Sequence, residues 1–332
     1  MRHARSARRP LLPALAAALL LAACGGGDDA EDLATEVAQG YAADAVTMSV
    51  AGTTTVDVSA DVLEGAVATA AAAAAQREQL LAAQVGPTAS ATLTAACPTG
   101  GSVSWTVTGD AATIGNGQLD AGETFAVVYN ACGSAGGGSI DGSATFTVTA
   151  RSASLLAFTH TTNALTQTTT NGSFVHSGSV SVSRSEAALA GGGREVTRRV
   201  TSPGVTLQSR IGTVAGTRVA TYQLNALDWT VTRTYGSSNE LTARRHQGSA
   251  SLATSTPRRP NATLDVTAEG TLTLDGAGVA AAEGSFTVVT ARHRIRCVYG
   301  AGIATLTLDL GNDGSVDRTW VITLTRLVGD AG

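Results

Sequence analysis

The sequence predicts an all-β protein, an antiparallel meander of long strands rich in threonine and serine, folded as a sandwich or an open barrel and preceded by an alanine-rich helix. From residue 88 onward, apolar side chains alternate with serine or threonine, as in residues 143–150 (SATFTVTA). This period of two is typical of strands with one buried face. Turn-forming pairs such as Asn116-Gly117 separate the alternating runs, and the apolar runs and crossover helices of a parallel sheet are missing.

The alternation predicts about a dozen strands. The runs cover residues 91–97, 102–108, 124–132, 143–150, 178–185, 218–222, 230–235, 248–254, 263–274, 285–292, 294–299, 303–310 and 316–327. Gly142, Gly178, Gly248 and Gly284 are each followed by serine at irregular intervals. Irregular spacing argues against a solenoid or propeller of fixed period. It favours a meander whose long strands bend or bulge at glycine.

The sequence pattern over residues 59–87 predicts a helix. The stretch is rich in alanine, and Asp61 with Glu64 three positions later forms a capping-box pattern at its start. Gly86-Pro87 ends the helical pattern. Because alanine offers only a shallow apolar stripe, we expect this helix either to lean on the β domain or to stay loose near the anchor.

The N-terminus has the pattern of a secretory signal. Four arginines precede an apolar run over residues 11–23, which is too short to span a bilayer as a helix. The run ends in Leu21-Ala22-Ala23-Cys24, which resembles the lipobox of bacterial lipoproteins. The resemblance covers only about the first thirty residues. It implies cleavage before Cys24 and attachment of diacylglyceryl and palmitate chains to that cysteine. Gly25 in place of aspartate resembles the class that is sorted to the outer membrane.

These patterns together give the domain organisation. Residues 1–23 are expected to form the signal peptide and residues 24–58 a lipid-anchored tether, which begins with a flexible glycine and aspartate stretch. Residues 59–87 form the helix and residues 88–332 the β domain. The expected location is the outer membrane, with the lipid on Cys24 as the contact to the bilayer.

Charge and motifs exclude several functional classes. The chain has 22 basic residues, all of them arginine, and 26 acidic residues. It has no basic stripe of the kind that binds nucleic acid. A chain without lysine has no P-loop lysine and no Schiff-base lysine. The GxSxG, HExxH, CxxC and GxGxxG patterns are also absent from the sequence, so we expect no enzymatic activity.

Three cysteines remain after Cys24. We expect Cys97 to pair with Cys132, because each lies at the end of a predicted strand and the segment between them reads as a compact meander. Cys297 is then the odd cysteine, buried in the strand over residues 294–299. A reactive thiol at Cys297 is the alternative interpretation, although no histidine and asparagine partners are evident in the sequence.

Two loops carry a partial calcium-binding pattern. Asn116, Asp120 and Glu123 match three ligand positions of an EF-hand loop, but the first positions offer no side-chain oxygen. Asp309, Asp313 and Asp317 lie at alternate spacing in a second loop and are the better candidates. The alternative for both loops is a hairpin turn with solvated carboxylates.

Histidine and tryptophan offer two further hypotheses. His160, His176, His246 and His293 lie in or beside predicted strands, so neighbouring strands can bring two of them together as a metal pair. Trp105, Trp229 and Trp320 form either core or a platform for stacking sugars.

The sequence therefore predicts a lipid-anchored cell-envelope protein that is a non-catalytic structural or binding module. The alternative is a lipid- or glycan-binding envelope protein that uses the apolar sheet face. No cofactor is expected beyond the calcium hypothesis, and the partner beyond the membrane is a protein, a lipid or a glycan. A large cavity lined by leucine, valine and phenylalanine favours ligand handling, and a closed core favours the structural role.

Overall fold

A computed structural model describes residues 55–56, 63, 66–74, 88–133, 138–169, 172–213, 216–255, 262–275, 278–291 and 293–323 of the chain. The signal peptide, Cys24, the tether up to residue 54 and the capping box of the predicted helix lie outside these residues. Residues 63 and 66–74 are helical, which agrees with the predicted helix where the structure describes it. Residues 55–56, which were expected to belong to the tether, are helical as well.

The described chain is dominated by one antiparallel sheet in which each strand pairs with the next along the chain, as the sequence predicts. The sheet has 14 strands in the order β1 to β14. Their bounds are Thr88–Ala96, Ser102–Asp110, Thr124–Gly133, Ser139–Arg151, Leu155–Thr169, Gly172–Ala188, Arg194–Thr213, Gly216–Tyr235, Leu241–Ser255, Ala262–Asp275, Gly278–Val289, His293–Gly300, Ile303–Leu310 and Arg318–Thr323.

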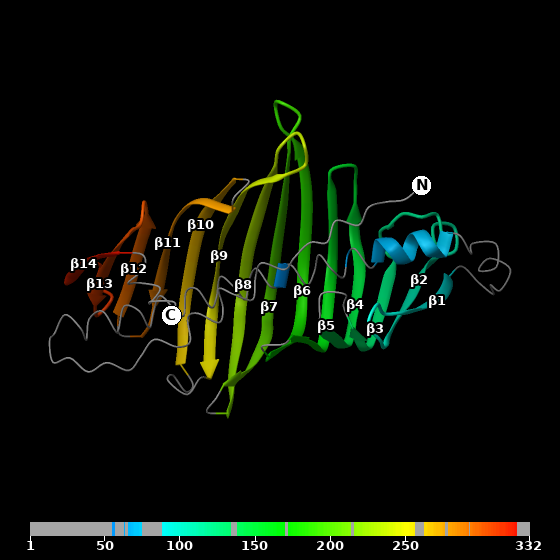
Figure 1. Ribbon diagram of the computed structural model, residues 1–332, viewed down its shortest axis with the longest axis horizontal. Helices are drawn as coiled ribbons and strands as arrows, with labels where there is room; N and C mark the ends of the chain where they lie inside the picture. The colour runs from blue at the N-terminus through cyan, green and yellow to red at the C-terminus, as the bar shows by residue number, and fades with distance from the viewer. Residues whose placement is uncertain are drawn as a thin grey trace.

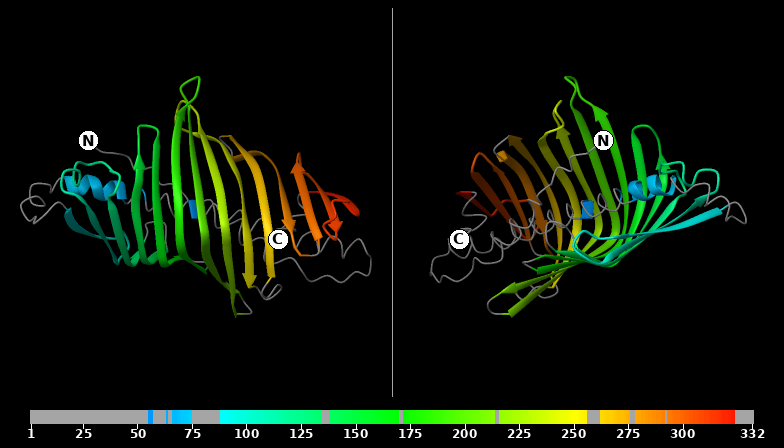
Figure 2. Two further views of the ribbon diagram at one scale, coloured as in Figure 1. Left: turned by 180° about the vertical axis from the view of Figure 1, so that it is seen from behind. Right: turned by 45° about the vertical axis from the view of Figure 1, so that its right-hand side comes forward.

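The sheet curls without closing, so of the two predicted packings the open one is observed. β1 and β14 lie at opposite ends of the molecule (Figure 1). The central strands β6, β7 and β8 are the longest, and the turned view shows them bending so that the sheet surrounds a concave side (Figure 2).

The concave side carries the core. Buried apolar residues alternate with exposed polar ones along each strand, and the helical residues Val56, Leu63, Ala66, Ala70 and Ala73 belong to the same buried cluster. Residues 66–74 lie against the β1–β4 end of the sheet (Figures 1 and 2). The apolar face is therefore closed by packing where the helix contacts it, as expected for a helix that leans on the β domain.

Bulges bend the strands, as the glycine pattern predicts. The register shifts at Gly142 in β4 and between Ser179 and Ser181 in β6, next to two of the Gly-Ser pairs. Three bulges place alanine at positive φ: Ala131, Ala164 and Ala226 have φ of 47°, 49° and 50°. Each extra residue shifts the alternation by one position and turns the rest of its strand.

Candidate functional site

A polar groove crosses the outer face of the sheet at its centre. It has a volume of about 600 Å³ and extends over the five neighbouring strands β7 to β11. Most of its lining side chains alternate with buried residues, as Asp228 does between Leu227 and Trp229. The lining residues are Arg199, Asp228, Thr230, Gln247, Gly248, Ser249, Thr267, Ala268, Glu269 and Ser285.

Two small residues let the backbone line this groove. Gly248 and Ala268 pair with each other in the register, and both stand at positions of their strands that belong to the buried, apolar face. They therefore border the groove with main-chain atoms. On the opposite, apolar face, the indole of Trp229 lies against Gly248, and the ring of His246 against Gly270. Glycine is required at position 248 because Trp229 and the Asp228 carbonyl occupy the space of a Cβ.

An ion pair defines one end of the groove. The guanidinium of Arg199 donates two hydrogen bonds to Asp228, from Nε to Oδ1 at 2.8 Å and from the second terminal nitrogen to Oδ2 at 2.6 Å. This fork lowers the pKa of Asp228 below its usual value, chiefly through the hydrogen bond from Arg199. Both side chains remain about half exposed, at 56% and 45%, so both can contact a ligand.

A second carboxylate lies on β10. Glu269 Oε1 accepts a hydrogen bond of 3.1 Å from Ser285 Oγ on β11. No histidine or cysteine is among the described lining residues. The groove thus combines two carboxylates, one guanidinium, one amide and several hydroxyls. This set matches a ligand that presents many hydrogen-bonding groups.

The first calcium candidate is a turn whose carboxylates accept hydrogen bonds from other residues of the same loop. Asn116 Nδ2 donates to Asp120 Oδ2 at 2.6 Å, and the Asp120 N–H donates to Glu123 Oε2 at 2.9 Å. Glu123 is buried at 2% exposure, and burial raises the pKa of its carboxyl group. These oxygens act as acceptors within the loop, which is the role of turn residues.

The second calcium candidate is also a turn. Asp309 Oδ1 and Oδ2 accept the N–H groups of Asp313 and Gly314 at 3.1 and 3.0 Å, and Asp317 Oδ2 accepts the N–H of Leu310 at 2.6 Å. Among the described residues, no three Asp, Glu, His or Cys side chains are arranged to hold a metal ion. The three aspartates were calcium candidates on the condition that a tight turn brings their carboxylates together; in the structure these carboxylates accept backbone N–H groups of the turn.

The histidines and tryptophans lie mostly on the apolar face. His160 and His176 are brought side by side and buried, with ring centroids 6.3 Å apart. His246 stacks on Trp229 at 5.6 Å. Trp105 and Trp229 are core residues and Trp320 packs on the same cluster while partly buried, so the three do not form a platform in the groove. The side chain of His293 lies outside the described residues.

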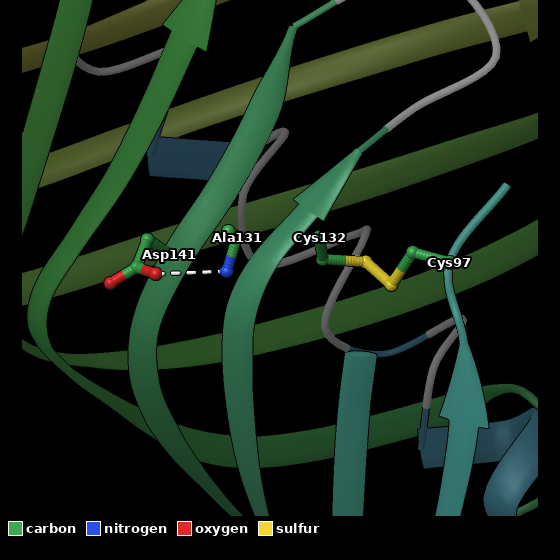
Figure 3. Close-up of a disulfide and its surroundings, with 4 residues drawn as sticks. All are labelled: Cys97, Ala131, Cys132 and Asp141. Carbon is green, nitrogen blue, oxygen red and sulfur yellow. Dashed lines mark hydrogen bonds between the residues drawn. A yellow bond between two sulfur atoms is a disulfide. The ribbon is translucent and has the colours of Figure 1, made fainter. Parts of the chain in front are cut away.

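The predicted disulfide is confirmed. Cys97 and Cys132 are bonded, with a Cα–Cα distance of 5.3 Å (Figure 3). The adjacent bulge at Ala131 is held by its N–H, which donates to Asp141 Oδ2 at 2.9 Å. Cys297 is a buried free cysteine in β12, and burial raises the pKa of its thiol to about 12. A thiol with this pKa stays protonated at neutral pH, which does not suit a nucleophile.

No family model, no curated protein and no solved structure matches this chain. Within the described part of the chain, no helix has the length and apolar character needed to cross a membrane.

Sequence reasoning missed the groove itself. Arg199 lies on β7, a strand that the alternation did not predict, and the carboxylates of Asp228 and Glu269 come from strands distant in sequence. One signal was available, because Ser249 and Ser285 belong to the Gly-Ser pairs noted in the sequence. Nothing in the sequence alone brings those pairs together on one surface.

Proposed function

We propose that this chain is a lipid-anchored protein of the bacterial outer membrane, held by the lipid on Cys24, and that its sheet is a non-catalytic module that binds a glycan in the polar groove. The anchor is supported by the lipobox-like residues 21–24. The binding role is supported by one observation above all, the groove of about 600 Å³ on the outer face of the sheet.

The chemistry of the lining favours a glycan over an acyl chain. Sugar hydroxyls pair with carboxylates, amides and guanidinium groups, and the lining supplies Asp228, Glu269, Gln247 and Arg199. An acyl chain needs an apolar cavity, whereas the leucine, valine and phenylalanine side chains of the concave face are packed in the core. The proposed ligand site is therefore on the polar sheet face rather than on the apolar one.

The ion pair with Arg199 also suits a binding role for Asp228. Its pKa is lowered by Arg199, so the carboxyl group is ionised at neutral pH and is not a proton donor. The ion pair instead presents a fixed acceptor and donor to the ligand.

Binding is tested on an array of bacterial envelope oligosaccharides, namely peptidoglycan fragments and lipopolysaccharide core sugars, followed by calorimetry on the best binder. Asp228→Asn and Glu269→Gln should each weaken binding by about tenfold or more, because a hydrogen bond to a charged group is worth about 1.5–3 kcal/mol. Glu186→Gln is the matched control. Glu186 also pairs with an arginine, but it lies outside the groove lining, so affinity should not change. If the wild-type chain binds no oligosaccharide, the glycan-binding proposal is wrong and a purely structural role is favoured instead.

The anchor is tested separately. Cys24→Ser removes the only thiol that can accept the acyl donor and should leave an unlipidated precursor that is released from membranes by a carbonate wash. If the variant fractionates with membranes as the parent does, the lipoprotein assignment is wrong.

A further inference from the structure

The groove lies between two rows of side chains that cross the strands. Within each row, every residue is the direct register partner of the next one. The first row is Arg199, Thr230, Gln247, Glu269 and Ser285, one residue from each of β7 to β11. The second row is Asp228, Ser249 and Thr267, on β8 to β10.

These rows give the groove a long and narrow outline. Neighbouring strands are about 4.8 Å apart, so five strands span about 19 Å, and rows two positions apart along a strand are about 7 Å from each other. The main chain of Gly248 and Ala268 lies between the rows. A ligand with this outline is an extended chain that lies across the strands and meets hydrogen-bonding groups on both sides.

Hydrogen bonds to neighbouring side chains orient two polar groups of the first row. Arg245 Nη2 donates to Gln247 Oε1 at 3.1 Å, which leaves the Nε2 amide group of Gln247 as a donor for a ligand. Ser285 Oγ donates to Glu269 Oε1 at 3.1 Å, which leaves Oε2 of Glu269 as an acceptor. Gln247 and Glu269 are register partners, so a donor and an acceptor stand next to each other in the row.

The lining carries one net negative charge, because it has two carboxylates and one guanidinium group. The guanidinium of Arg199 donates two hydrogen bonds to Asp228, so these two charges match each other. Glu269 accepts its hydrogen bond from a hydroxyl group, and it takes part in none of the ion pairs between described residues. The unmatched charge is therefore at Glu269, where a cationic group of a ligand can pair with it.

We propose that the ligand of the groove is a linear glycan with free amino groups, which lies across the strands and places one ammonium group on Glu269. The inference rests on the proposed glycan-binding function and names the class of glycan. An ammonium group donates charge-assisted hydrogen bonds to a carboxylate, which are stronger than bonds between neutral groups. An N-acetylated sugar offers a neutral amide at the same place, and an acidic sugar meets a like charge, which disfavours it.

The test is calorimetry with two matched ligands, the β-1,4-linked tetramers of glucosamine and of N-acetylglucosamine, at about pH 6, where an amine is protonated. The two tetramers share one backbone and differ in the amino group. The wild type should bind the glucosamine tetramer about 10–100-fold more tightly, as expected for a hydrogen bond to a charged group. The glucosamine dimer should bind more weakly than the tetramer, because it reaches fewer strands of the groove.

Glu269→Gln is the decisive variant, because it removes the unmatched charge and keeps the shape of the side chain. The ratio of the two affinities should fall to about one, with the N-acetylglucosamine tetramer still bound. Asp265→Asn is the matched control. Asp265 is an exposed carboxylate on the same strand and face, outside the groove lining, so this variant should keep the wild-type ratio. A lysine oligomer with the charge of the glucosamine tetramer should not displace the glycan.

The proposal is overturned if the N-acetylglucosamine tetramer binds as tightly as the glucosamine tetramer, if Glu269→Gln keeps the wild-type ratio, or if the lysine oligomer competes as well as the glycan does. Binding of neutral oligosaccharides without a preference for the amine would refute this inference and leave the glycan-binding function standing. If the wild type binds no oligosaccharide of any kind, both are wrong.

Discussion

Trp229 lies so close to Gly248 that a Cβ on the glycine would stand 2.5 Å from Cε3 of the indole, and closer still to the carbonyl oxygen of Asp228. Trp229 is fully buried, and Asp228 lines the groove. One glycine therefore couples core packing on the apolar face to the backbone position of a groove residue on the other face.

Gly248→Ala should destabilise the protein by about 1–3 kcal/mol, the usual cost of overpacking a core. The measurement is the free energy of unfolding in urea, followed by tryptophan fluorescence. Gly204→Ala is the control, because a Cβ there meets only Asn225 Oδ1 at 3.4 Å. An equal loss of stability in both variants would contradict a specific clash with Trp229.

Removing the disulfide by Cys97→Ala with Cys132→Ala should cost about 3–4 kcal/mol on the chain-entropy model for a loop of this size. The cysteines are 35 residues apart. Urea unfolding of the double variant measures the loss. Peptide mapping without reductant should show this pair linked and Cys297 free, whereas a link from Cys297 to either partner would refute the pairing.

Stability should fall as the pH drops below about 6.5. Burial lowers the pKa of His160 to about 3 and that of His176 to about 4, whereas both titrate near 6.5 in the unfolded chain. The unfolded state then binds more protons below pH 6.5, and each histidine contributes a loss of up to about 1.4 kcal/mol per pH unit. This loss continues until the pH reaches the folded pKa values.

Urea midpoints at pH 7.5, 6 and 5 measure this dependence. The pH dependence should be shallower in His160→Leu, which keeps the other titrating groups of the wild type. An unchanged pH dependence in this variant would mean that His160 is not buried in the neutral form.

Asp309→Ala should destabilise the turn between β13 and β14 by about 1–3 kcal/mol, because it leaves two N–H groups without their acceptor. Asp309 is buried at 6% exposure and accepts the N–H groups of Asp313 and Gly314. Asp313→Ala removes one exposed bond to the Ser315 N–H and should cost less. Thermal melts with and without millimolar calcium should give the same order of stabilities. A large rise of the wild-type melting temperature in calcium would instead make this loop a cation site.

The meander was predictable because local alternation survives in most strands, but three strands were missed or divided in the prediction. β8 was predicted as two strands, since the bulge at Ala226 places Leu224 and Leu227 on the same buried face three positions apart. β5 was missed because its bulge at Ala164 interrupts the pattern. β7 was missed because its arginines and Pro203 hide the alternation.

The sequence by itself determined the all-β class, the antiparallel neighbour pairing, the disulfide between Cys97 and Cys132 and the bending at Gly-Ser pairs. Each of these depends on residues close in sequence or on a short list of cysteines. Only the tertiary structure decided that the sheet stays open, that five strands share one polar groove, and that His160 and His176 meet. These features depend on register, and a bulge of one residue changes which side chains face each other across strands.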